Sequence, residues 1–272
     1  MNSNKIAKVF EELKTIGKKA FIPYITAGDP DLEKTLELLA ILAENGADII
    51  ELGVPFSDPM ADGPVIQSAM ERALKSGTTL RKVLQMVRDF KARYSVPIAL
   101  MGYFNPFYAY GIETFAKDAG AAGVDAVLTV DLPPEEARAF VDLLWKEGIV
   151  SIFLATPVTD KKRLQVINGI ARGFIYFVSV TGVTGERSAL PEGLKDKISE
   201  IKKEIKLPLV LGFGISGVDT IREYAGYVDG LVVGSALVKR WEGACMSNEE
   251  PAAFKDFFRE LAEACHTTSQ SR

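Results

Sequence analysis

The sequence predicts an α/β protein, a closed (β/α)8 barrel of the TIM type with an extra helix at its N-terminus. Short apolar runs alternate with amphipathic segments along most of the 272 residues, and strands that alternate with helices pair in parallel through crossovers. Eight such runs can be counted, the number that closes a barrel. The turn after the first run, AGDP, lacks the glycine-rich pattern that an open doubly wound sheet usually carries there.

The elements follow in order from the pattern. Residues 2–18 are predicted to be a helix, because apolar residues recur there at helical spacing and Ser3 or Asn4 could cap it. The strand-like runs are 20–26, 48–54, 98–103, 125–131, 150–156, 174–180, 209–214 and 229–235. Helical patterns between them include 32–45, 113–122, 134–147 and 162–172, and a glycine follows several helices, at Gly46, Gly123, Gly148 and Gly173, where a left-handed residue is commonly needed.

Two connections stand out by their length and loop composition. Residues 55–97 hold the loop PFSDPMADGP and two helical patterns, and the connection after the sixth run opens with TGVTGERSALPEG. Loops that leave the C-terminal ends of barrel strands form the active face, so chemistry or a lid is expected there. With no linker in the chain, we expect one domain over residues 1–266 and a disordered tail at 267–272.

Composition narrows the function classes. The net charge of −4 and the 25% of charged residues offer no basic surface for nucleic acid or an anionic membrane. No apolar run is long enough to span a membrane and no signal-peptide pattern is present, so a cytoplasmic protein is expected. Two cysteines and one histidine, Cys245, Cys265 and His266, argue against disulfide scaffolds, metal sites and His-dependent triads.

Glu51 is the most unusual residue of the apolar runs. Strand alternation places Ile50 and Leu52 on the face that packs against helices and turns Glu51 into the barrel near the end of its strand. Burial would raise the pKa of this carboxyl, which suits a general acid–base working near neutral pH. A structural carboxylate bonded to its neighbours is the alternative.

Three aspartates on the active face are ambiguous. Asp62 lies eleven residues after Glu51 in a loop rich in Pro and Gly, close to Asp58. Loop aspartates usually form turns or cap helices, and Asp62-Gly63-Pro64 would suit a helix entry. Asp131 ends a strand and could equally be a cap or a site residue. Composition alone favours the structural interpretation for Asp58 and Asp62.

Glycines near the end of the chain indicate a phosphate site. Gly212-Phe213-Gly214 ends the seventh run and Gly234-Ser235 ends the eighth, where a helical pattern begins. Glycines let backbone N–H groups approach an anion, and a helix N-terminus carries partial positive charge. Barrels frequently bind phosphate between the loops after strands 7 and 8. Together these features predict a phosphate-ester enzyme that uses carboxylate acid–base chemistry.

Several stretches resemble, in order, those of the tryptophan synthase alpha subunit family. The most specific is IELGVPFSDPMADGPVIQ, and it is joined by PYITAGDP, LMGYFNP, VLTVDLP, YFVSVTGVTG, LGFGIS and VDGLVVGSALVK. The resemblance extends from about Phe21 to Lys239. It implies a (β/α)8 barrel that cleaves indole-3-glycerol phosphate to indole and glyceraldehyde 3-phosphate, a carbon–carbon lyase of tryptophan biosynthesis.

The resemblance also implies roles for individual positions. Glu51 matches the family's catalytic acid–base and Asp62 its second catalytic carboxylate. The matching phosphate-binding positions are Gly185, Gly214, Gly234 and Ser235; the matching indole-pocket positions are Tyr24, Met101, Leu128 and Tyr176; and Thr184 matches a lid threonine that contacts the loop aspartate.

By the same resemblance, the chain would work in an α2β2 assembly with a beta subunit that carries pyridoxal phosphate and receives indole through a tunnel. No cofactor or metal is expected in this chain, and the loops 57–62 and 181–189 would respond to the beta subunit. The alternatives are a free-standing indole-3-glycerol-phosphate lyase and a non-catalytic activator subunit that only binds a phosphate ester. A related phosphate-binding synthase or isomerase would fit the glycines but not the Glu51 motif.

Overall fold

The predicted barrel is confirmed. The computed structural model describes residues 4–178, 193–212, 214–247 and 251–267. Within them, eight parallel strands close into a ring in chain order, with β8 paired to β1. The strands are β1 Ala20–Thr26, β2 Ile50–Gly53, β3 Ile98–Gly102, β4 Ala126–Thr129, β5 Val150–Ala155, β6 Ile175–Val178, β7 Leu209–Gly212 and β8 Gly230–Val233. Each falls within a predicted run, and the residues left over at the run ends belong to the adjoining loops.

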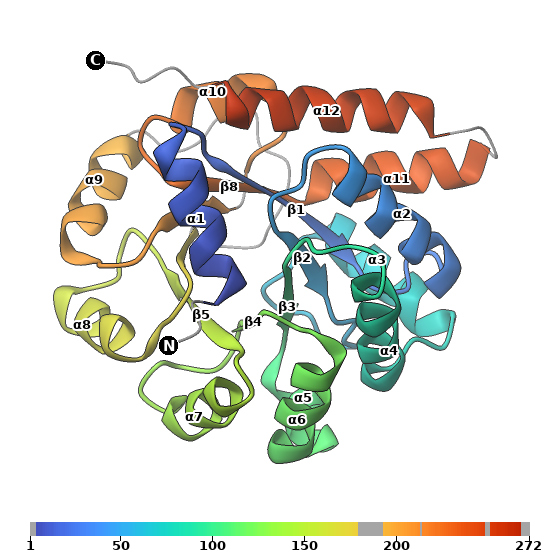
Figure 1. The fold of residues 1–272 in the computed structure, drawn as a ribbon, viewed down its shortest axis with the longest axis horizontal. Coiled ribbons are helices and arrows are strands. Elements are labelled where there is room, and N and C mark those ends of the chain that lie inside the picture. The colour runs from blue at the N-terminus through green and yellow to red at the C-terminus, as the bar shows by residue number, and fades with distance from the viewer. Residues whose placement is uncertain (1–3, 179–192, 213, 248–250, 268–272) are drawn as a thin grey trace.

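Helices surround the ring of strands (Figure 1). They are α1 Lys5–Thr15, α2 Leu32–Glu44, α3 Pro64–Lys75, α4 Leu80–Lys91, α5 Phe104–Tyr110, α6 Ile112–Ala122, α7 Arg138–Lys146, α8 Lys161–Ile170, α9 Leu194–Glu204, α10 Val218–Tyr224, α11 Ser235–Ser247 and α12 Ala252–His266. Helix α7 begins four residues later than the pattern predicts, because Pro133 and Pro134 open a stretch of turns. The short α5 was not predicted separately. No helix of the described ranges is both long and apolar enough to cross a bilayer.

Helix α1 closes the end of the barrel where the strands begin. Asn4 caps it, accepting a hydrogen bond from the Ile6 N–H at 2.8 Å. The Asn4 side-chain amide also donates to the backbone carbonyls of Gly148, at 2.9 Å, and Asp125, at 3.2 Å, which precede β5 and β4. Ile6 joins the apolar cluster inside the barrel, as does Phe10, whose ring centroid lies 5.6 Å from that of Phe174. The capped N-terminal helix predicted from the sequence is therefore confirmed.

Three aspartates join neighbouring strands at this same end. Each accepts a hydrogen bond from a backbone N–H at the start of the adjacent strand, at 2.7 to 2.9 Å; the pairs are Asp48 with Phe21, Asp125 with Ile98 and Asp229 with Leu209. Each aspartate also lies 2.6 to 2.9 Å from a basic side chain, respectively His266, Lys91 and Lys202. These polar contacts stabilise the face opposite the strand C-termini and leave the other face to carry function.

The glycines at the helix ends behave as predicted. Gly46, Gly123, Gly148 and Gly173 all have positive φ, between 77° and 109°, a conformation that residues with a Cβ rarely adopt. The expected tail after His266 falls mostly on residues 268–272, which lie outside the described residues.

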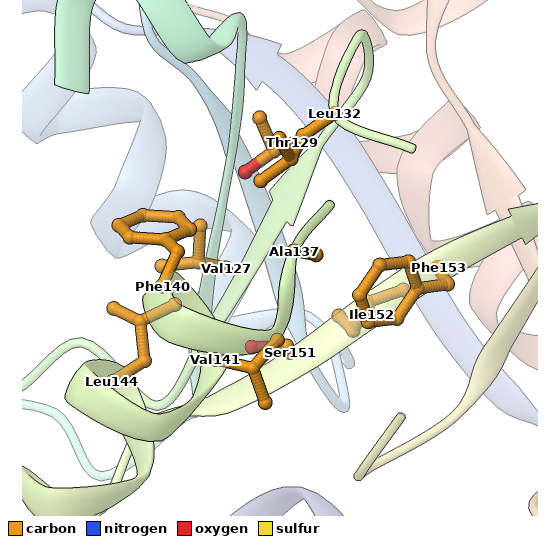
Figure 2. Close-up of a pocket in the computed structure, with 10 residues that line it drawn as sticks. All are labelled: Val127, Thr129, Leu132, Ala137, Phe140, Val141, Leu144, Ser151, Ile152 and Phe153. Atoms are coloured by element: carbon orange, nitrogen blue, oxygen red, sulfur yellow. The ribbon is translucent and has the colours of Figure 1, made fainter. Parts of the chain in front are cut away.

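A small cavity lies between α7 and the strands β4 and β5 (Figure 2). Its volume is about 10 Å³, the space of a single water molecule. The buried Ser151 hydroxyl lines it and has no hydrogen-bond partner within the described part of the chain. This cavity is too small for an organic substrate, so the candidate site must lie elsewhere.

Candidate active site

Glu51 points into the barrel from the middle of β2. Its neighbours Ile50 and Leu52 pack in the layer between strands and helices, while Ile49 belongs to the interior cluster, as strand alternation predicts. The Glu51 side chain is 1% exposed, and neither carboxyl oxygen has a hydrogen-bond partner among the described residues. The alternative of a carboxylate held by neighbours therefore finds no support in the described contacts.

The environment of Glu51 changes its proton affinity. Burial, and secondly the negative charge of Asp62, raise the pKa of Glu51 to about 8. Burial disfavours the charged form because the carboxylate loses its hydration, and a nearby like charge adds to that cost. At neutral pH the Glu51 carboxyl is therefore mainly protonated and can donate a proton.

Asp62 lies in the loop between β2 and α3, and it is buried too, at 2% exposed. Its carboxylate accepts a hydrogen bond from the Tyr103 hydroxyl at 2.7 Å. Burial raises the pKa of Asp62, and the bond from Tyr103 opposes that shift. Gly63 is the N-cap of α3 with no side-chain cap bond, and Pro64 is the first helical residue. The Asp62 carboxylate thus does not cap the helix, one of the two structural roles that composition favoured. The Asp62 N–H does close a turn, donating to the Pro59 carbonyl at 3.0 Å.

Asp131, unlike Asp62, has a structural role. Its exposed carboxylate accepts a hydrogen bond from the Phe104 N–H at 2.7 Å, at the start of α5. Tyr103 is the N-cap residue of α5 and makes no side-chain cap bond. The carboxylate of Asp131 thus satisfies the first backbone N–H of the helix, which has no acceptor within it. Asp58 is exposed as well and accepts from the neighbouring Ser57 hydroxyl.

The four predicted indole-pocket side chains lie in one buried cluster inside the barrel, on β1, β3, β4 and β6: Tyr24, Met101, Leu128 and Tyr176. Tyr24 pairs with Glu51 across the strands. Burial raises the pKa of Tyr24 and of Tyr176, and the nearby charges of Glu51 and Asp62 contribute to both shifts. The structure therefore brings these aromatic rings and the two carboxyl groups to one end of the barrel interior.

Two glycines make room for the tyrosine rings. A Cβ atom on Gly53 would lie 2.2 Å from the Tyr24 hydroxyl oxygen, and one on Gly212 would lie 2.1 Å from a Tyr176 ring carbon. Real Cβ atoms do not approach other heavy atoms so closely. The glycines at the ends of β2 and β7 thus determine how the rings fit into the barrel mouth.

The predicted phosphate-binding glycines Gly214 and Gly234 follow two adjacent strands, β7 and β8. Leu211 pairs with Leu231, and Gly214 and Gly234 each come three residues later. Gly214 has a φ of +79°. The Gly234 carbonyl accepts from Leu237 N–H at 2.8 Å and Val238 N–H at 3.0 Å, so Gly234 starts α11. Ser235 and Ala236 then present N–H groups with no acceptor inside the helix, at its partly positive end. Thr184 and Gly185 lie outside the described residues.

The sequence interpretation did not name Tyr103, which contacts Asp62. Tyr103 follows β3 directly, so it stands at the C-terminal end of a strand on the active face. This position at a strand end is the feature of the sequence that could have identified Tyr103 as a candidate site residue. Its bond to Asp62 depends on the path of a loop 41 residues away, which local patterns do not reveal.

Comparisons with known proteins identify the family of the chain. The family model described as "Tryptophan synthase alpha chain" matches residues 10–266. The tryptophan synthase alpha chain of Geobacter sulfurreducens is 52% identical over 259 residues, covering 94% of this chain and 98% of that protein. That of Geotalea daltonii is 51% identical over 238 residues, covering 88% and 90%.

Solved structures give the same result. The tryptophan synthase subunit alpha of Legionella pneumophila superposes with a TM-score of 0.91 at 42% identity, covering 97% of this chain and 98% of that one. A chain of the tryptophan synthase complex from Pyrococcus furiosus gives a TM-score of 0.81 at 39% identity, covering 90% and 99%. A match over most of its length, in sequence and in structure, therefore shows that the chain belongs to the tryptophan synthase alpha chain family.

Proposed function

We propose that Glu51 and Asp62 carry out the reaction of this lyase, the retro-aldol cleavage of indole-3-glycerol phosphate to indole and glyceraldehyde 3-phosphate. The observation that carries the proposal is the Glu51 carboxyl, buried inside the barrel, without a hydrogen-bond partner among the described residues and with its pKa raised to about 8. A carboxyl that keeps its proton at neutral pH can act first as an acid and then as a base.

The cleavage needs two proton transfers. Glu51 first gives its proton to indole C3, which turns the ring into an iminium ion with positive charge at nitrogen. The Glu51 carboxylate then takes the proton from the 3′-hydroxyl of the glyceryl chain. As that oxygen forms the aldehyde carbonyl, the bond between indole C3 and the glyceryl carbon breaks, and its electron pair neutralises the iminium. Glu51 ends in its protonated form, ready for another turnover.

Asp62 stabilises the positive charge that develops on the ring. As a carboxylate it would accept a hydrogen bond from the indole N–H, and this bond strengthens as the nitrogen becomes cationic. The hydroxyl of Tyr103 donates to Asp62 at 2.7 Å, which favours the ionised form. The two carboxyl groups thus take different roles because, among the described residues, only Asp62 receives a hydrogen bond from a neighbouring side chain.

The remaining site residues hold the substrate. The phosphate is bound by backbone N–H groups at Gly214, Gly234 and Ser235, together with Gly185, and the α11 N-terminus supports its charge. The indole ring lies among Tyr24, Met101, Leu128 and Tyr176, whose side chains belong to the interior cluster. A role for Thr184, which lies outside the described residues, rests on the family resemblance alone. The barrel over residues 1–266 acts as one unit.

We further propose that the chain forms a cytoplasmic α2β2 complex with a beta subunit that carries pyridoxal phosphate and takes up the indole. The family relation supports a beta-subunit partner, and one of the similar structures is a tryptophan synthase complex. A groove of about 320 Å³ is lined by the β2–α3 loop, including Phe56 and Met60, and by α3. Met60 is 81% exposed there, which suits a surface that another subunit covers.

The test is indole release from indole-3-glycerol phosphate, followed with and without a purified beta subunit. We expect slow release by the chain alone and strong stimulation by the partner. Full activity alone would instead identify a free-standing lyase. No indole in either assay would reduce the chain to a phosphate-ester-binding activator and overturn the roles of Glu51 and Asp62.

A further inference from the structure

We propose that Tyr103 is a positioning residue for the cleavage, because one hydroxyl group fixes both the carboxylate of Asp62 and the backbone beside it. The proposal rests on the proposed role of Asp62 as the group that stabilises the indole cation. Tyr103 is itself buried, at 2% exposed, so its hydroxyl bonds to protein groups instead of bulk water.

The hydroxyl takes part in two hydrogen bonds at once. It donates to the Asp62 carboxylate at 2.7 Å and accepts from the Ala61 N–H at 3.0 Å. A bond to a carboxylate is charge-assisted and among the stronger protein hydrogen bonds. Since Ala61 and Asp62 are consecutive, the two bonds determine both the direction of the carboxylate and the path of the chain that carries it.

The ring of Tyr103 holds the beginning of the same loop. It stacks on Phe56, with 5.1 Å between ring centroids and 29° between ring planes. Phe56 lies two residues after Val54, whose N–H donates to the Met101 carbonyl at 2.8 Å at the end of the strand pairing. One side chain thus contacts the loop at its start, through Phe56, and at its end, through Asp62.

Tyr103 is well placed for this role because its own backbone is anchored. It directly follows β3, where the Val130 N–H donates to the Gly102 carbonyl at 2.9 Å. It also directly precedes α5, where the Phe104 N–H donates to Asp131 at 2.7 Å. Groups that position catalytic side chains act best from such rigid elements, because a displacement of about 1 Å is costly to the rate.

Tyr103→Phe tests the proposal, because it keeps the ring and its stacking and removes only the hydroxyl. We expect kcat to fall roughly ten- to hundredfold, the range that the loss of a hydrogen bond to a charged group produces, with KM changed less than about threefold. The bond also favours the ionised form of Asp62. The acid limb of the kcat profile should therefore move to higher pH, which a merely structural role would not cause.

Tyr110→Phe is the matched control. Its hydroxyl donates to the Asp118 carboxylate at 2.6 Å, a bond of the same type between α5 and α6. We expect this variant to keep kcat and its pH profile. A Tyr103→Phe enzyme that also keeps both would overturn the proposal.

Combining Tyr103→Phe with Asp62→Asn distinguishes a failure of this proposal from a failure of the proposed function. In an Asp62→Asn background, Tyr103→Phe should lower kcat by less than about twofold more, since Tyr103 acts through the carboxylate charge that Asp62→Asn has already removed. If Asp62→Asn alone keeps kcat, the role of Asp62 fails. If Asp62→Asn loses kcat and the effect of Tyr103→Phe is simply multiplied onto it, the positioning role fails and that of Asp62 stands.

Should Tyr103→Phe not fold, 3-fluorotyrosine at position 103 provides the second measurement. Its more acidic phenol donates more strongly and should move the acid limb to lower pH. An unmoved acid limb in that folded protein would refute the positioning role.

Discussion

Tyr103 donates a hydrogen bond to Asp62, whereas no described residue hydrogen-bonds to Glu51, although both carboxyl groups are buried at one end of the barrel. Burial raises the pKa of each. The bond from Tyr103 opposes the shift only at Asp62, and the charge of Asp62 adds to the shift at Glu51. Environments that separate two carboxyl groups in this way assign one to proton donation and the other to charge stabilisation.

The first expected consequence concerns the pH dependence of the rate. Glu51 must begin the reaction protonated, and its pKa is raised to about 8. We therefore expect kcat/KM, measured as indole release, to fall tenfold per pH unit above about 8. Circular dichroism over the same range controls for unfolding. A rate that stays constant up to pH 9.5 in the folded protein would contradict the role of Glu51 as the acid.

The second prediction concerns the pH dependence of the stability of the folded state. Because the pKa of Glu51 is higher in the folded protein than its ordinary value of 4.5, the folded state loses stability as pH rises from about 4.5 to about 8. Glu51→Gln removes the charge, so it should be more stable than the parent protein at pH 8.5, by a few kcal/mol at roughly 1.4 kcal/mol per pKa unit. The difference should vanish near pH 4.5.

Urea unfolding at both pH values measures this difference. Glu260→Gln in α12 is the control, because that side chain is exposed and its charge stays in water. Equal stabilities of Glu51→Gln and the parent at pH 8.5 would show that the buried carboxyl carries no such cost.

The third prediction concerns the catalytic role of Asp62. Asp62→Asn preserves the size of the side chain and removes the charge that supports the indole cation. We expect kcat to fall by about 10² to 10³, the usual effect of losing one electrostatic contact in the transition state, with KM nearly unchanged. Steady-state kinetics of indole release decides the matter: a defect confined to KM would reassign Asp62 to substrate binding.

The fourth prediction concerns the phosphate site at Gly234. A Cβ atom on Gly234 would lie 3.5 Å from the Tyr24 side chain, an ordinary contact, so Gly234→Ala should fold normally. The methyl group would obstruct the approach of the phosphate to the start of α11. We expect KM to rise at least about tenfold, from the loss of one charge-assisted hydrogen bond.

Gly243→Ala, within α11 itself, provides the comparison. Nothing lies within 4 Å of a Cβ atom at that exposed position, and alanine there should stabilise α11 by about 1 kcal/mol without changing KM. If the two variants have the same KM as the parent protein, the phosphate is bound elsewhere.

The sequence predicts the barrel well, because its signals are local. Alternation of apolar runs and helical patterns locates all eight strands, and parity alone turns Glu51 inward. The left-handed glycines at 46, 123, 148 and 173 follow from the same local rules. The start of α7 was placed too early because the turns that follow Pro133 and Pro134 continue in a helix-like pattern.

Contacts between distant segments could not be predicted in this way. Composition favours Asp62 as a turn or cap residue, and its burial against Tyr103 depends on how the β2–α3 loop folds over the barrel mouth. Asp131 was ambiguous for the same reason, since the N–H from which it accepts a hydrogen bond belongs to the preceding strand connection, between β3 and β4. The resemblance to relatives identifies both carboxylates of the pair, but only the packed structure reveals their unequal partners.

The most direct measurement is a single turnover of indole-3-glycerol phosphate by Glu51→Gln, with bound substrate and released indole quantified in the same sample. Glutamine preserves the shape of the side chain but neither donates the proton to indole C3 nor accepts the one from the hydroxyl. We expect substrate binding within about threefold of that of the parent protein and a cleavage rate lower by at least about 10³, since each proton transfer contributes 10² to 10⁴. Cleavage at a tenth of the parent rate or faster would show that another group moves the protons.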